Sequence, residues 1–166
     1  MTRTMEPQNL ENKSFDAETT EHLVDFAEMF ESPCLIFMAD VGRELVKRGK
    51  KPAILDVDKR LSSIPGFRSF DLGRPVYTSH SFDLIICDPP ANVSHVQLFH
   101  ALKVLTHFDF ETPILVTTTP KRANAFKAAL SPFEMREVGF VPQYVSADEP
   151  AKEFWANFDA PLGLKR

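Results

Sequence analysis

The sequence of 166 residues has few of the features that mark several large classes of protein. It contains only two cysteines, Cys34 and Cys87, which is too few for a disulfide framework. No apolar run approaches the roughly 20 residues that cross a bilayer. Residues 1–13 are polar and lack the apolar core of a secretory signal. We therefore expect a cytoplasmic protein without a membrane segment, whose cysteines are free thiols.

Positive charge and short catalytic motifs are also scarce. The 19 lysine and arginine residues are outnumbered by 23 aspartate and glutamate residues, which gives a net charge of −4. This balance argues against nonspecific wrapping of duplex DNA. The sequence has no phosphate-binding loop, no Gly-x-Ser-x-Gly and no zinc-ligand spacing. His95, His100 and His107 share a predicted helix but do not all fall on one face, so we expect no metal site.

Short apolar runs alternate with amphipathic segments along the chain. Strands are predicted at residues 34–38, 53–57, 67–70, 82–87 and 113–118, and helices at 16–31, 41–48, 94–107 and directly after 119–120. This alternation predicts an α/β fold with a doubly wound, mostly parallel sheet. Two further strands at 133–141 and 153–158, with no helix between them, predict an antiparallel C-terminal hairpin edge. We expect residues 15–166 to form this single domain after a flexible tail at 1–14.

The helix at residues 94–107 has the clearest local pattern. Ser94 and Gln97 have the spacing of a capping box, which predicts the start of the helix. Val96, Phe99 and Leu102 are expected to face the core. Most of the 15 phenylalanines are also expected in the core rather than on a base-stacking surface.

The most informative local feature is Asp88-Pro89-Pro90, directly after the predicted strand at 82–87. The carboxyl end of a parallel strand is where open α/β sheets hold their ligands. The two prolines stiffen the turn and leave carbonyl groups that no strand ladder uses. A carboxylate beside rigid carbonyl acceptors is suited to holding an amino group by its N–H donors. The alternative interpretation is a turn that only ends the strand.

This turn resembles the Asp/Asn-Pro-Pro-aromatic motif of amino-group methyltransferases that use S-adenosylmethionine, with Ala91 in place of the aromatic residue. Other segments resemble, in the same order, the landmarks of the probable N6-adenine methyltransferase family, whose eukaryotic members include lysine methyltransferases acting on elongation factor 1A. These segments are residues 55–61, Phe70-Asp71, 82–90 and 152–158, where Lys152-Glu153-Phe154 resembles the family's Asn-Glu-Phe. The resemblance covers about residues 32–161. It implies a class I, Rossmann-like methyltransferase sheet and S-adenosylmethionine as the cofactor.

The resemblance also implies candidate residues for binding the nucleoside part of the cofactor. Asp56 and Asp58 follow the second predicted strand, where a carboxylate can accept hydrogen bonds from both ribose hydroxyls. Asp71 ends the next strand and is a candidate acceptor for the adenine amino group. The alternatives are a solvated strand end for Asp56 and Asp58, and a turn residue for Asp71.

The loop after the first predicted strand is the candidate site for the methionine carboxylate of the cofactor. Ala39, Asp40 and Gly42 open a helix there, and backbone N–H groups at a helix start bind anions. The loop has no Gly-x-Gly, and Asp40 places an acid next to a carboxylate-binding position.

The implied reaction is direct displacement. Asp88, the Pro89 carbonyl and the stiffening Pro90 would hold the acceptor nitrogen in line with the sulfonium methyl. The acidic composition favours a protein lysine as the acceptor, and adenine N6 in DNA or RNA is the alternative. A third hypothesis is a non-catalytic binding or scaffold subunit, as one half of a heterodimer, because Ala91 and Asp40 depart from the family at positions that touch ligands.

Overall fold

A computed structural model describes residues 14–76, 79–146 and 148–160, so the predicted tail at 1–14 lies almost entirely outside the described residues. The strands are β1 Pro33–Ile36, β2 Ala53–Asp56, β3 Phe67–Ser69, β4 Leu84–Cys87, β5 Ile114–Thr118, β6 Arg136–Glu137 and β7 Glu153–Ala156. The helices are α2 Ala17–Ala27, α3 Ala39–Lys47, α4 His95–Leu105 and α5 Ala123–Ala129, with 3-10 turns η1 Lys59–Leu61, η2 Pro120–Arg122 and η3 Ser131–Phe133. Within the described ranges, no helix is long and apolar enough to cross a bilayer.

The strands form one seven-stranded sheet in the order β3-β2-β1-β4-β5-β7-β6. All pairs from β3 to β5 are parallel, and β7 is antiparallel to both β5 and β6. The prediction of a doubly wound, mostly parallel sheet with an antiparallel C-terminal hairpin edge is therefore confirmed. In this arrangement β7 lies between β5 and β6, next to the parallel part of the sheet.

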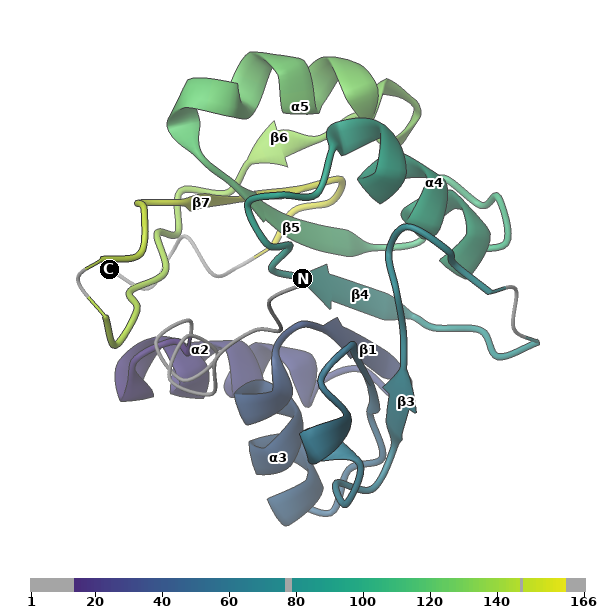
Figure 1. Ribbon diagram of the computed structural model, residues 1–166, viewed down its shortest axis with the longest axis vertical. Helices are drawn as coiled ribbons and strands as arrows, with labels where there is room; N and C mark the ends of the chain where they lie inside the picture. Colours follow the sequence, from purple (N-terminus) through teal and green to yellow (C-terminus); the bar gives the residue numbers. More distant parts are fainter. Residues whose placement is uncertain (1–13, 77–78, 147, 161–166) are drawn as a thin grey trace, which may run out of the picture.

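Two apolar layers cover the sheet, one on each face. Figure 1 shows α2 and α3 on one face and α4 and α5 on the other. Leu98 and Phe126 belong to the apolar cluster under α4 and α5, whereas Leu23 and Leu45 belong to the cluster under α2 and α3. Because the central strands are covered on both faces, every residue of β4 and β5 is buried.

Helix α4 begins as predicted and faces the core with the predicted residues except Val96. The Ser94 hydroxyl accepts from the Gln97 N–H at 3.1 Å, and the Gln97 side chain accepts from the Ser94 N–H at 3.3 Å, so the capping box is confirmed. Leu98 and Leu102 are buried, but Val96 is 74% exposed, so its predicted inward position is wrong. Val96 lies about 200° around the helix axis from Leu98, which places it on the opposite side.

The predicted strand at 133–141 is reduced to β6, Arg136–Glu137. Glu134 and Gly139 flank it with φ angles of 58° and 90°. These left-handed conformations are incompatible with extended strand geometry. The edge strand is therefore confined to Arg136 and Glu137, which are two of the four residues between them.

Both cysteines are buried and free, as expected. They lie on adjacent strands, where Cys34 pairs with Ile85 and Cys87 pairs with Ile36. Burial raises the pKa of both thiols, which keeps them protonated and poorly nucleophilic.

Candidate active site

The loops that follow β1, β2 and β4 leave the sheet at the same edge. The Asp88 N–H, just after β4, donates to the Ile36 carbonyl at the end of β1 at 3.1 Å. The Phe37 N–H, just after β1, donates to the Leu55 carbonyl of β2 at 2.9 Å. The hydrogen bonds align the three strand ends, so the fold brings the predicted cofactor and acceptor residues to one edge of the sheet.

Asp88 is the buried centre of a polar network at this edge. Its side chain is 2% exposed. Its Oδ1 accepts from the Thr117 hydroxyl at 2.7 Å and from Lys152 Nζ at 2.9 Å. The Tyr144 hydroxyl lies 3.1 Å from both carboxylate oxygens. These three donors compensate a buried negative charge, which a turn that only ends a strand would not require.

Lys152 Nζ contacts both acceptors that the sequence assigned to a bound amine. Besides the Asp88 carboxylate, it donates to the Pro89 carbonyl oxygen at 3.1 Å. The Lys152 side chain is 5% exposed, and its Nζ lies 5.8 Å from the centre of the Tyr144 ring. The turn therefore holds a primary amine, and in this structure the amine comes from the same chain.

Tyr144 is fixed in place by the segment that opens α2. Its backbone forms an isolated antiparallel bridge with Phe15, and the two rings stack with centroids 5.1 Å apart. Burial, followed by the charge of Asp88 and the hydrogen bond to it, raises the pKa of Tyr144. The hydroxyl therefore stays protonated and acts as a donor to Asp88.

The three partners of Asp88 were not predicted as site residues. They lie 29, 56 and 64 residues from Asp88 along the chain. Thr117 lies at the end of a predicted strand near the site, but threonine is an ordinary strand residue and that interpretation is preferred, while Tyr144 has no recognisable pattern around it. Lys152 did carry a signal, because it stands where the resembled family has asparagine. Only the antiparallel placement of β7 beside β5 brings that lysine to the end of β4.

Asp56 and Asp58, which the sequence left as alternatives, lie in different surroundings. Asp56 is the last residue of β2, is 8% exposed, and accepts from the Asp58 N–H at 3.0 Å. The Asp58 carboxylate accepts from Arg60 Nε at 3.0 Å and from Arg60 Nη2 at 2.9 Å. The side-chain hydrogen bonds from Arg60 lower the pKa of Asp58. Asp58 is thus already committed to an ion pair, which leaves Asp56 as the better candidate for the ribose.

Asp71 lies in the turn after β3. It is exposed, and its Oδ1 accepts from the Gly73 N–H at 2.9 Å. This is the geometry of an Asx turn, in which an aspartate side chain bonds the backbone two residues later. The turn interpretation therefore accounts for Asp71, and contact with an adenine amino group stays a prediction.

The loop after β1 continues directly into α3. Ala39 and Asp40 are the first two residues of the helix, and the Asp40 carboxylate pairs with Arg43 at 2.8 Å. Arg43 offsets the charge of the acid that the sequence placed next to an anion-binding position. Gly42 is buried, donates its N–H to Met38 at 3.2 Å, and faces Ile54, so close helix–strand packing accounts for this glycine.

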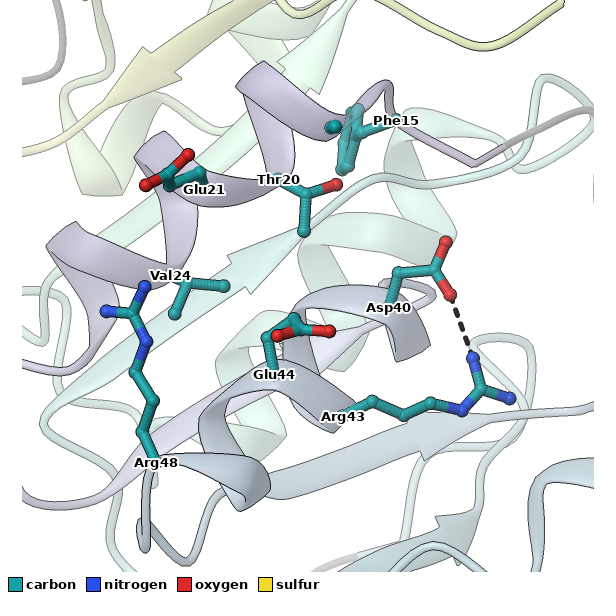
Figure 2. Close-up of a pocket in the computed structure, with 9 residues that line it drawn as sticks. Phe15, Thr20, Glu21, Val24, Asp40, Arg43, Glu44 and Arg48 are labelled. Carbon is teal, nitrogen blue, oxygen red and sulfur yellow. Dashed lines mark hydrogen bonds and ion pairs between the residues drawn. The ribbon is translucent and has the colours of Figure 1, made fainter.

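A cavity of about 620 Å³ lies between α2 and α3. Figure 2 shows Thr20 and Val24 of α2 facing Asp40 and Glu44 of α3 across it. Phe15 forms part of its wall. Because Phe15 also stacks on Tyr144, its ring contacts both this cavity and the Asp88 network.

Comparison with known proteins adds a family and a fold. A family model described as "Probable N6-adenine methyltransferase" matches residues 15–160. A search of curated proteins gave no match. Among solved structures, an S-adenosylmethionine-dependent methyltransferase from Clostridium acetobutylicum matches with 8% identity and a TM-score of 0.58, over 85% of this chain and 91% of that chain.

Two further structures give the same result. A TehB-like S-adenosylmethionine-dependent methyltransferase from Corynebacterium glutamicum matches with 12% identity and a TM-score of 0.59, over 90% of this chain and 92% of that chain. Magnesium protoporphyrin IX methyltransferase from Synechocystis, solved with its S-adenosylmethionine, matches with 12% identity and a TM-score of 0.58, over 90% of this chain and 77% of that chain. These likenesses establish a Rossmann-like methyltransferase fold.

Proposed function

This chain belongs to the probable N6-adenine methyltransferase family, and from that premise we propose that it transfers a methyl group from S-adenosylmethionine to a protein lysine. The observation that carries the proposal is the pair of contacts from one primary amine, Lys152 Nζ, to the Asp88 carboxylate at 2.9 Å and to the Pro89 carbonyl at 3.1 Å. The acceptors of the turn are therefore spaced to hold the amine of a lysine side chain.

Residues at the edge formed by β1 and β2 are suited to bind the cofactor. Asp56 offers a buried carboxylate at the end of β2, where two ribose hydroxyls can donate to it. The first N–H groups of α3, at Ala39 and Asp40, lie at a helix start, where orphan donors attract a carboxylate. When bound, S-adenosylmethionine supplies an electrophilic methyl group on a sulfonium, so no metal or nucleophilic side chain is required.

The residues around Asp88 position the acceptor nitrogen and receive its proton. Asp88 and the Pro89 carbonyl fix two N–H groups, and Pro90 stiffens the turn that carries them. Holding reactants in a near-attack arrangement supplies much of the rate in such displacements. The Asp88 carboxylate, which here accepts from Lys152 Nζ, would also take the proton that the acceptor nitrogen must lose before it attacks. Tyr144 and Thr117 donate to Asp88 and hold its orientation.

Cofactor binding is the first test. The Tm of the purified chain should rise when S-adenosylmethionine or S-adenosylhomocysteine is added. At a ligand concentration of 100 times Kd, the free energy of unfolding should increase by about 2.7 kcal/mol. No shift at millimolar cofactor would favour the scaffold hypothesis instead.

Methyl transfer to lysate proteins is the second test. Asp88→Asn should lower transfer by about 10²-fold or more, because it removes the proton acceptor while keeping the shape of the side chain. Asp159→Asn is a matched control, since Asp159 is an exposed partner of Arg136 at the surface. Full transfer by the Asp88→Asn variant would show that the reaction takes place elsewhere.

Adenine N6 is the second candidate acceptor because the family model carries that description. Two observations favour lysine over it. The net charge is −4, and Ala91 is an exposed residue where an aromatic side chain would stack on a base. Digestion of the lysate after transfer of a labelled methyl group distinguishes the two acceptors. Loss of label with protease supports lysine, and loss of label with nuclease would show that adenine is the acceptor.

A further inference from the structure

We propose that Lys152 is itself a methyl acceptor, so that the chain methylates its own Nζ at the Asp88 site. This inference rests on the proposed function, because it uses the same methyl donor and the same amine-holding turn. It names a modification site within the chain, in addition to any external protein substrate.

The argument begins from the position of one atom. Lys152 Nζ contacts Asp88 Oδ1 at 2.9 Å and the Pro89 oxygen at 3.1 Å. These are the two groups proposed to hold an acceptor nitrogen during transfer. The turn has room for one amine, and Lys152 Nζ occupies that position. A donor methyl group that points at an amine in this position therefore points at Lys152 Nζ. An external lysine can react there only after Lys152 has left.

The backbone keeps Lys152 in that position. Glu153, the next residue, begins β7 and pairs with Thr118 at the end of β5. The Lys152 side chain therefore extends from the start of β7, which lies beside the carboxyl end of β5, toward the end of β4. The side chain is 5% exposed. An amine held in this way has the advantage of an intramolecular reactant over a lysine that must arrive from solution.

The transfer balances without any further reactant. Asp88 accepts one proton from the Lys152 ammonium, and the nitrogen lone pair that results forms a bond to the sulfonium methyl carbon. The carbon–sulfur bond breaks, its electron pair stays on sulfur, and S-adenosylhomocysteine leaves as a neutral thioether. The methyl group takes the place of the proton that moved to Asp88, and Asp88 then releases that proton to solvent. The product is a monomethylated ammonium, which already carries the positive charge and two N–H groups for the same two acceptors, so we expect monomethyllysine as the main product.

The experiment uses the full chain incubated with S-adenosylmethionine carrying a deuterated methyl group. Peptide mass spectrometry should find one labelled methyl group on Lys152 and none on the exposed Lys51 and Lys121. Lys152→Arg should remove the label, and Asp88→Asn should slow labelling by about 10²-fold or more. The rate of Lys152 labelling per molecule should not change when the protein is diluted about 100-fold, because the reaction is intramolecular.

A second readout needs no cofactor. Brief acylation of the ligand-free protein with an amine reagent should label Lys152 at least about tenfold more slowly than Lys51, because the Lys152 amine is buried and charge-paired. Equally fast labelling of the two lysines would show that Lys152 leaves the turn readily, and this would overturn the proposal.

Separate measurement of S-adenosylhomocysteine binding distinguishes the two levels of the argument. If the cofactor binds and a lysate protein is methylated while Lys152 stays unlabelled, the self-methylation proposal is wrong and the proposed function stands. If the cofactor does not bind, the proposed function itself is wrong. The wild-type chain alone decides between these outcomes, so neither depends on whether a variant folds.

Discussion

Asp88 carries its charge at a position where 2% of its surface meets solvent, so its neighbours decide whether the site is stable. Lys152 supplies the opposite charge, and Thr117 and Tyr144 supply hydroxyl donors. A buried ion pair contributes little net stability compared with an apolar pair, but removal of one partner leaves an uncompensated charge. This asymmetry separates the structural role of Lys152 from its chemical role.

A double-mutant cycle measures that asymmetry. Lys152→Met leaves the Asp88 carboxylate without its cation, and we expect unfolding in urea to show a loss of about 3–5 kcal/mol. Combination with Asp88→Asn removes the stranded charge, so the double variant should recover most of that loss. If the losses measured for Lys152→Met alone and Asp88→Asn alone simply add in the double variant, then the two side chains do not interact as the distances indicate.

Tyr144 makes the stability of the folded state depend on pH in the alkaline range. Burial and the charge of Asp88 raise its pKa above the ordinary value of 10.0, so the folded state favours the protonated hydroxyl. A group with a raised pKa contributes its full stability below the unfolded pKa and loses it as pH rises above that value. The difference in Tm between wild type and Tyr144→Phe should therefore be constant from about pH 6 to 8 and shrink from about pH 9 to 11. A constant difference across both ranges would contradict this account.

At the scale of elements, the sequence predicts the parallel core well and the edge poorly. The apolar runs that became β1, β4 and β5 are buried on both faces, so their composition alone identifies them. The short β6 could not be predicted, because it is limited by left-handed residues on both sides and not by composition. On α4 the predicted inward face is right at Phe99 and Leu102 but wrong at Val96. Val96 and Leu98 are both apolar, and only the packing on the sheet decides which one points inward.

Helix α3 lies close to β2 because residue 42 has no side chain. A Cβ on Gly42 would meet Ile54 Cδ1 at 2.5 Å, so Gly42→Ala should destabilise the fold by about 1–3 kcal/mol in urea denaturation. Ile54→Ala removes the obstructing atoms, and the double variant should lose less than the sum of the single variants. Gly73→Ala is a control, since among the described residues the atoms nearest its added Cβ, Asp71 Oδ1 and Gln97 Nε2, lie 3.4 Å away. Equal losses for Gly42→Ala and Gly73→Ala would mean that helix–strand contact does not set the effect.

Across the whole molecule, the carboxyl edge of the sheet divides into two halves. The half at β1 and β2 carries Asp56 and the start of α3, which are local features that follow directly from strand ends. The half at β4, β5 and β7 carries Asp88 with its partners, of which the sequence predicted only Asp88 and the adjacent prolines. Lys152 and Tyr144 reach Asp88 through long-range strand pairing and ring stacking. Such contacts have no periodic pattern in the sequence, and for that reason the acceptor half could be predicted only in part.

The two halves should respond separately to substitution. Asp56→Asn should weaken binding of S-adenosylhomocysteine by about 10–100-fold in calorimetry, because hydrogen bonds to a charged group are worth about 1.5–3 kcal/mol. Asp58→Asn is the matched control, since its carboxylate is already paired with Arg60 at 2.9 Å, and its Kd should stay within about threefold of wild type. Asp88→Asn should likewise leave cofactor affinity nearly unchanged, because Asp88 belongs to the acceptor half. A larger loss for Asp58→Asn than for Asp56→Asn would assign the ribose to the Asp58 carboxylate, and it would mean that Arg60 exchanges its partner when the cofactor binds.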